Sequence, residues 1–208
     1  MSVQELQQPH TSDDFGHFVK GWLRNPLAMG ALAPSGKSLA KLMAKDVGTG
    51  SRVVELGAGT GTVTEALLAK GVAPENLYLV ERERQFVKIL ERRFPRCRVI
   101  AADALKLDRE LDAEPAFDFV ISGLPLLCFS PEKRYRLLQQ SLQLLKTHGH
   151  LHQFTYGGRC PIDKDLRALL RVDSVLLGIA ALNLPPGFVY RLTPRLPARR
   201  GSLVPETP

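Results

Sequence analysis

One stretch constrains the fold of this chain more than any other, the sequence VVELGAGTGTVT at Val53–Thr64. Its apolar first residues are typical of a buried strand, and the residues after its last glycine are typical of a helix start. Gly57, Gly59 and Gly61 allow the backbone to turn tightly and to approach a ligand closely. A strand, a glycine turn and a helix in this order predict a binding site at the carboxyl edge of a parallel sheet.

Strands and helices are expected to alternate after this point, which is typical of a mostly parallel sheet covered by helices on both faces. The expected strands are Arg52–Leu56, Leu77–Glu81, Arg98–Ala101, Phe117–Ser122 and His150–Tyr156, with Val172–Leu182 and Phe188–Leu192 as a closing antiparallel pair. The expected helices run from just after Gly36 to Lys45 and over Val63–Lys70, Glu83–Phe94 and Pro131–Leu145. We divide the chain into a helical extension at 1–47, one α/β domain at 48–193 and a tail at 194–208, in which we expect little order.

The N-terminal extension carries an amphipathic pattern that predicts a helix. Phe15, Phe18 and Trp22 fall on one face, and Lys20 and Arg24 lie beside that stripe. Two interpretations stay open. The stripe packs on the domain, as core or as a lid over the ligand site, or it lies in a membrane interface where the basic residues meet anionic headgroups.

Charge and composition narrow the partners and the compartment. Lys and Arg outnumber Asp and Glu by 28 to 21, which favours a polyanionic partner such as nucleic acid or an anionic bilayer, with a solvated basic surface as the plain alternative. No apolar run reaches the roughly 18 residues that a spanning helix needs, so we expect any membrane contact to be peripheral. The three cysteines are widely spaced and form no zinc or disulfide pattern, which favours the cytoplasm. His148, His150 and His152 alternate on one strand face without a carboxylate or cysteine cluster, so we expect no metal there.

Two acidic residues at successive strand ends indicate which ligand the glycine turn serves. Glu81 follows the glycines by about 20 residues, where a carboxylate can accept both ribose hydroxyls of an adenosine. Asp103 follows the third strand, where a side chain can reach the adenine edge. Dinucleotide enzymes share the glycine turn and the first acid, whereas Asp103 and the turn at Ser122–Pro125 are not typical of their fingerprint.

From about Arg52 to Tyr156 the chain resembles the class I methyltransferases that use S-adenosylmethionine (AdoMet) and release S-adenosylhomocysteine. The resemblance implies a Rossmann-like, seven-stranded, mostly parallel α/β sheet whose last strand is antiparallel. It places Glu55 and the glycines at the methionine part of AdoMet, Glu81 at the ribose, and Asp103 with Ala104 at the adenine. The full set that it assigns to the cofactor is Glu55, Gly57, Ala58, Gly59, Gly61, Glu81, Arg82, Asp103, Ala104 and Ser122.

The turn after the fourth strand faces the cofactor's methyl group in that fold. Enzymes that methylate exocyclic base nitrogens often carry Asn-Leu-Pro-Tyr or Asp-Pro-Pro-Tyr there. This chain has Ser122-Gly123-Leu124-Pro125-Leu126, which lacks both the amide and the aromatic ring on which a base stacks. The likeness to ribosomal RNA adenine methyltransferases is thereby weakened, and nucleic acid methylation is kept as the alternative function.

The fuller pattern is similar to the bacterial phosphatidylethanolamine N-methyltransferases. The strings that carry this resemblance are Ser122–Leu127 (SGLPLL), Gln153–Gly157 (QFTYG) and Asn183–Tyr190 (NLPPGFVY). The family implies stepwise methylation of phosphatidylethanolamine towards phosphatidylcholine. It also implies a phospholipid substrate, no nucleic acid partner, a monomer, and peripheral attachment to the anionic inner face of the cytoplasmic membrane.

The acceptor site expected from this resemblance lies at the ends of the fourth and fifth strands. The turn formed by Ser122, Gly123, Leu124 and Pro125 is expected to face the reacting groups, and Tyr156 to hydrogen-bond the amine or to stabilise methylated cations over its ring. Tyr190 and Arg191 are expected to meet the lipid phosphate. The plain alternatives are a core tyrosine at Tyr156 and a solvated arginine at Arg191.

Overall fold

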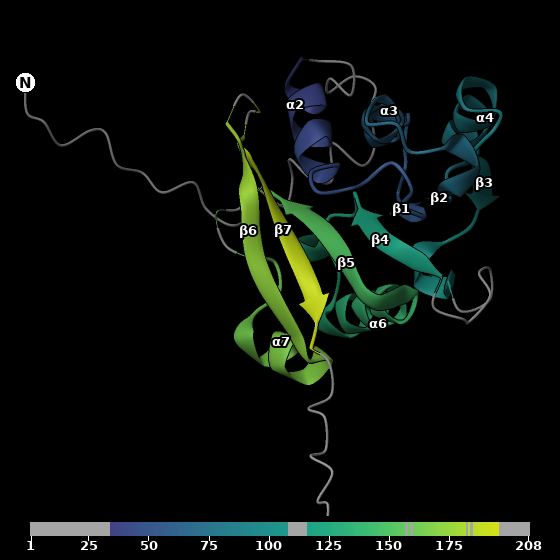
Figure 1. Ribbon diagram of the computed structural model, residues 1–208. Helices are drawn as coiled ribbons and strands as arrows, with labels where there is room; N and C mark the ends of the chain where they lie inside the picture. The colour runs from purple at the N-terminus through teal and green to yellow at the C-terminus, as the bar shows by residue number, and fades with distance from the viewer. Residues whose placement is uncertain are drawn as a thin grey trace, which may run out of the picture.

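The computed structural model describes residues 34–107 and 116–195, apart from 157, 159, 182 and 184. Its centre is a seven-stranded sheet in the order β3-β2-β1-β4-β5-β7-β6 (Figure 1). The strands are β1 (Val53–Leu56), β2 (Leu77–Glu81), β3 (Arg98–Ala101), β4 (Phe117–Ser122), β5 (Leu145–Thr155), β6 (Val172–Ala180) and β7 (Gly187–Pro194). Strand β7 runs antiparallel to its neighbours β5 and β6, while the pairs from β3 across to β5 are parallel. The predicted class I methyltransferase architecture is confirmed.

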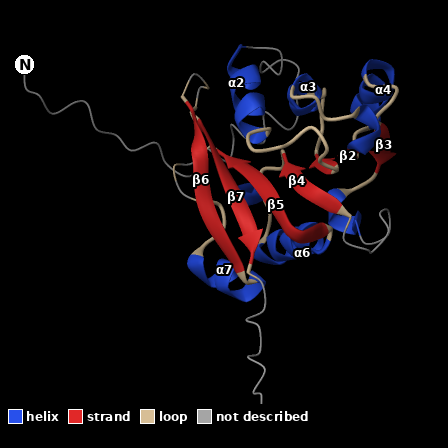
Figure 2. Cartoon of the chain, viewed as in Figure 1, coloured by secondary structure: helices blue, strands red, loops and turns tan. Residues whose placement is uncertain are grey.

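Helices cover both faces of the sheet (Figure 2). They are α2 (Pro34–Met43), α3 (Thr62–Ala69), α4 (Arg84–Arg93), α6 (Pro131–Gln143) and α7 (Lys164–Leu170), with short 3₁₀ turns η1 (Pro74–Asn76), η2 (Ala104–Lys106) and η3 (Leu126–Cys128). Leu79 packs with the residues of α2, α3 and α4, whereas its neighbour Val80 packs with those of α6 and α7. Each central strand is therefore buried on both sides, which explains why apolar residues dominate its sequence.

The structure departs most from expectation at the junction of α6 and β5 and at helix α7. The helix predicted to end at Leu145 ends at Gln143, and Leu145 instead begins β5 and pairs with Phe117 of β4. Because Leu145 is buried in both arrangements, apolar spacing alone does not mark where the helix stops. Helix α7 was not predicted, although Asp163 caps it by accepting a hydrogen bond from the Leu166 amide at 2.8 Å.

The predicted N-terminal helix lies outside the described residues. Phe15, Phe18, Lys20, Trp22 and Arg24 therefore keep the status of sequence-based predictions, as does the tail beyond Arg195. Among the helices that the structure does describe, none has the length and hydropathy needed to cross a bilayer.

Candidate active site

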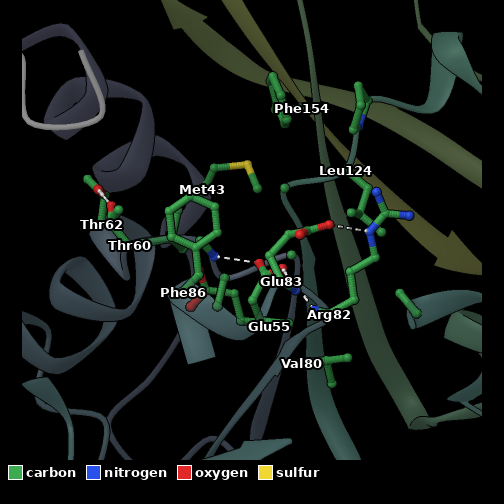
Figure 3. A pocket seen from close by; sticks show the side chains of 18 of the residues that line it. Met43, Glu55, Thr60, Thr62, Val80, Arg82, Glu83, Phe86, Leu124 and Phe154 are labelled. Atoms are coloured by element: carbon green, nitrogen blue, oxygen red, sulfur yellow. Dashed lines mark hydrogen bonds and ion pairs between the residues drawn. The ribbon is translucent and has the colours of Figure 1, made fainter. Parts of the chain in front are cut away.

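A cavity of about 430 Å³ opens at the carboxyl ends of the parallel strands, where the glycine turn was expected to place a ligand. Figure 3 shows Met43 and Phe86 on one side of it and Leu124 on the other. Most of the predicted site residues line this one cavity. They are Glu55, Gly57, Ala58, Gly59, Glu81, Arg82, Asp103, Ala104, Gly123, Leu124, Pro125 and Tyr156.

The glycine turn needs its glycines for two different reasons. Gly57, Gly59 and Gly61 all have positive φ, at 73°, 56° and 86°, where side chains are unfavourable. A Cβ on Gly57 would also come within 2.7 Å of Leu124 Cδ2, so the turn and the loop after β4 lie in direct contact. Gly61 does not line the cavity, because it caps α3 and packs against the ring of Phe94.

Glu81 is the side chain that ties the glycine turn to the end of β2. Its Oε2 accepts a hydrogen bond from the Gly59 amide at 2.9 Å, and its Oε1 accepts from the amides of Arg82 and Glu83 at 2.8 and 2.9 Å. The carboxylate is buried, yet it lines the cavity. Since each carboxylate oxygen has more than one acceptor position, Glu81 can hold the loop and still accept hydroxyls from a ligand.

Glu55 places a second carboxyl group deep in the same cavity. Thr64 Oγ1 donates a hydrogen bond of 2.6 Å to Glu55 Oε2. Burial, aided by the nearby charge of Glu81, raises the pKa of Glu55 to about 8, and the Thr64 hydrogen bond opposes this only in part. The carboxyl is therefore largely protonated at neutral pH, and a cation bound beside it would favour its ionised form.

This raised pKa predicts a pH-dependent stability. Folded protein keeps the Glu55 proton up to about pH 8, whereas the unfolded chain loses it above about 4.5, so the free energy of unfolding falls as pH rises through that window. The Glu55→Gln variant should lack this contribution, which amounts to roughly 1 kcal/mol per pH unit. Urea unfolding of both proteins between pH 6.5 and 8 measures the difference in slope.

The lower limit of that pH range avoids the opposite effect of His152. Burial lowers the pKa of His152 to about 4 from 6.5, so its contribution to stability is complete above pH 6.5 and is lost as pH falls towards 4. Parallel profiles for wild type and Glu55→Gln above pH 6.5 would show that Glu55 titrates normally.

Asp103 shapes the part of the cavity that follows β3. Its Oδ1 accepts a hydrogen bond from the Leu105 amide at 3.0 Å and so caps the turn η2, which positions the buried Ala104 against the cavity. Asp103 itself stays partly exposed to the cavity. The adenine edge assigned to these two residues by resemblance would find a carboxylate and an apolar methyl group side by side.

The loop after β4 is held in place from two sides. Gln153 Nε2 donates to Leu124 O at 2.8 Å, and a Cβ on Gly123 would lie 3.1 Å from Gly57 O. Ser122 is buried outside the cavity lining, with its Oγ accepting from the Leu124 amide at 3.4 Å. Gly123, Leu124 and Pro125 thus form the cavity wall, and Ser122 supports it from behind.

Two aromatic rings form the wall contributed by β5. Phe154 and Tyr156 line the cavity, with ring centroids 5.2 Å apart and planes at 83°. Burial raises the pKa of Tyr156, so its phenol stays protonated well above neutral pH. The Tyr156 phenol can hydrogen-bond a neutral amine, and the faces of the two rings can stabilise the cation that the amine becomes.

The two residues expected to meet a lipid phosphate lie elsewhere. Tyr190 Oη donates to Gly158 O at 3.3 Å, and the Arg191 guanidinium pairs with Asp46 at 3.2 Å. Neither lines the cavity. Any lipid contact by Tyr190 and Arg191 stays a prediction, and for Arg191 it has to compete with the ion pair.

The histidines of β5 serve the fold in the described structure. His152 Nδ1 donates to Met43 O at 2.8 Å, and His150 Nδ1 hydrogen-bonds with Thr193 Oγ1 at 3.0 Å. Within the described part of the chain, no group of three or more His, Cys, Asp or Glu side chains is placed to hold a metal ion.

Several cavity residues were not predicted from the sequence. The wall also includes side chains from α2, α4, η3, α6 and the turn before β7, namely Leu39, Met43, Phe86, Cys128, Phe129, Lys133 and Asn183. Asn183 begins one of the strings that carried the lipid methyltransferase resemblance, and that position was the one available signal. The others come from apolar or helical stretches whose folding partners lie far away in the sequence.

Comparison with known proteins agrees with this geometry. The methyltransferase domain family matches residues 53–149. The ornithine lipid N-methyltransferase of Singulisphaera acidiphila is 31% identical over 185 residues, covering 85% of this chain and 94% of that protein. The probable ribosomal RNA small subunit methyltransferase A of Methanosarcina acetivorans is 30% identical over 174 residues, and the match spans 79% of this chain but 59% of that protein.

Solved structures share the fold at low identity. The 1,6-didemethyltoxoflavin-N1-methyltransferase of Burkholderia thailandensis, solved with S-adenosylhomocysteine, superposes with a TM-score of 0.63 at 16% identity, covering 92% of this chain and 94% of that one. Phosphoethanolamine N-methyltransferase 1 of Haemonchus contortus has a TM-score of 0.61 at 15% identity, covering 88% of this chain and 49% of that one.

Proposed function

This chain belongs to the class I AdoMet-dependent methyltransferases, in the family of the ornithine lipid N-methyltransferase, and we propose that it methylates the primary amine of a membrane lipid. The acceptor that we propose is phosphatidylethanolamine, methylated stepwise towards phosphatidylcholine by a protein attached peripherally to the inner membrane face. The observation that carries the proposal is the cavity itself. On one side it has the glycine turn and two buried acids, and on the other it has an acceptor wall, formed by Leu124, Pro125, Phe154 and Tyr156.

The residues of the cavity fit AdoMet. The positive φ of Gly57 and Gly59 leaves backbone free to approach a ligand, and Glu81 and Glu55 offer carboxyl groups to a molecule with cationic centres and ribose hydroxyls. AdoMet supplies an electrophilic methyl group on a sulfonium. The protein then has to hold the neutral acceptor in line with that methyl, a positioning effect worth roughly 7–11 kcal/mol at best.

The acceptor wall favours an aliphatic amine over a nucleobase. Gly123 and Leu126 stand where base methyltransferases with an Asn-Leu-Pro-Tyr turn carry the amide and the stacking ring, so this turn offers no flat platform for a base. Tyr156 can hydrogen-bond the amine in its neutral form, the form that has a lone pair to react. The match to the ribosomal RNA enzyme spans 79% of this chain but 59% of that protein, and a methyltransferase fold common to both is enough to account for it.

Radiolabelled methyl transfer to vesicles tests this function. One set of vesicles contains phosphatidylethanolamine in an inert lipid, a second contains ornithine lipid, and a third assay contains ribosomal RNA. We expect label in mono-, di- and trimethylated headgroups of the first set. Label in the second set alone would assign ornithine lipid, the substrate named for the relative, and label in the RNA alone would overturn the lipid proposal.

The proposed membrane attachment leads to a separate prediction for the helix expected near the N-terminus. Trp22→Ala should lower flotation with anionic vesicles by about 10-fold, the loss expected for one large apolar side chain withdrawn from the interface, and leave AdoMet affinity unchanged. A matched control is Leu169→Ala on α7, since Leu169 is 66% exposed yet lies at the opposite edge of the sheet from the cavity. Equal losses of flotation and of AdoMet affinity would show that Trp22 covers the cofactor site instead.

A further inference from the structure

The turn between β6 and β7 brings one more polar side chain to the cavity. Strand β7 begins where β5 ends, since Thr155 pairs with Phe188, so this turn lies beside Tyr156 at the carboxyl edge of the sheet. Asn183 lies in the turn and lines the cavity while only 7% of its surface is exposed. The turn therefore contributes a buried amide to a wall that is otherwise aromatic and apolar.

The side-chain oxygen of Asn183 has no hydrogen-bond partner among the described residues. Leaving a buried acceptor unpaired is costly, so a buried carbonyl oxygen that lines a cavity points to a ligand that donates to it. The backbone at this position is held in place, because the Asn183 backbone N–H donates to Ala180 O at 3.1 Å. The side-chain Nδ2 lies beside Gly187, where an added Cβ would be 3.6 Å away.

We propose that Asn183 Oδ1 accepts an N–H hydrogen bond from the acceptor amine and thereby turns its lone pair towards the methyl donor. This inference rests on the proposed function. In each transfer the lone pair of the neutral amine forms the new N–C bond, and the methyl–sulfonium bond breaks with its electrons left on sulfur. The primary, monomethyl and dimethyl ammonium groups each release a proton to water before they react, whereas the trimethylated product has no N–H and keeps its charge. Asn183 is thus a positioning residue for the acceptor nitrogen.

The proposal distinguishes the three successive transfers from one another. A neutral primary amine has two N–H groups, a monomethylated amine has one, and a dimethylated amine has none. Asn183 can therefore position the nitrogen for the first two transfers but cannot do so for the third. A residue that only supports the fold would affect all three alike.

The test measures each transfer separately, with vesicles containing phosphatidylethanolamine, its monomethyl form or its dimethyl form. Asn183→Leu removes the oxygen at similar size. We expect kcat/KM for the first two acceptors to fall about 10- to 100-fold, the range for a hydrogen bond at a reacting amine, and that for the third to stay within about 3-fold. Asn183→Ala is the second variant, used if the leucine variant fails to fold.

Gln140→Leu is the matched control. Gln140 is a buried amide on α6 whose Oε1 is likewise unpartnered, but it does not line the cavity. We expect this variant to lower the three rates by a common factor or not at all. An equal fall in all three rates for Asn183→Leu, or no fall, overturns the inference, whereas a wild type that methylates no amine lipid overturns the proposed function instead.

Discussion

Replacing Glu81 with alanine is expected to weaken AdoMet binding by about 1–3 kcal/mol, or roughly 5- to 150-fold, the range for a lost hydrogen bond to a charged group. Glu81 lines the cavity and also accepts hydrogen bonds from the Gly59, Arg82 and Glu83 amides. Alanine removes a ligand group and leaves these amides without their acceptor. The glycine turn then loses its link to β2, so the loss should lie towards the upper end of that range.

Glu83→Ala is the control for this prediction. Glu83 also lines the cavity, but its carboxylate is half exposed and, within the described part of the chain, pairs only with the exposed side chain of its neighbour Arg82. An exposed ion pair contributes little, so we expect its AdoMet affinity to stay within about 3-fold of wild type. Titration calorimetry measures both affinities. If Glu81→Ala bound as tightly as Glu83→Ala, Glu81 would have no role in holding the cofactor.

The cofactor half of the site could be predicted because its determinants are local. A buried strand, a turn that needs positive φ and a helix start follow one another within Val53–Thr64, and all of them appear in the structure. Glu81 and Asp103 were located by counting strands, and parallel strands bring their carboxyl ends to one edge. The local strand–turn–helix pattern, together with the rule that parallel strands end at one edge of the sheet, was enough to predict this half of the site.

The acceptor half could not be predicted in the same way. Leu39 and Met43 of α2 line the cavity because that helix packs over β6 and β7, a contact between distant parts of the sequence. Asn183 reaches the cavity only because β7 inserts between β5 and β6, which no local pattern indicates. The resemblance assigned Ser122 to the cofactor, whereas the structure buries Ser122 outside the cavity lining. Because β4 is buried on nearly its whole length, its sequence does not say which way each side chain points.

The largest loss in the free energy of unfolding is expected for a substitution of Gly61. Its φ of 86° disfavours any side chain, and a Cβ there would collide with the ring of Phe94 and approach Leu90 Cδ2 to 3.1 Å. Because α4 packs Phe94 and Leu90 into the core, neither can move freely. Gly61→Ala combines backbone strain with overpacking, so we expect it to lower the free energy of unfolding by about 2–5 kcal/mol.

Gly59→Ala separates these two causes, because Gly59 shares the positive φ while, beyond its two chain neighbours, no atom of a described residue lies within 4 Å of its Cβ position. Strain alone predicts a loss of about 1–2 kcal/mol. Urea unfolding of the two variants gives the comparison, and equal losses would show that Phe94 yields without cost. A larger loss of stability for Gly61→Ala than for Gly59→Ala would also show that the two glycines have different roles in the glycine turn. Gly61 closes the packing between α3 and α4, whereas Gly59 keeps its surroundings open for the ligand, so Gly59→Ala should lose more AdoMet affinity than stability.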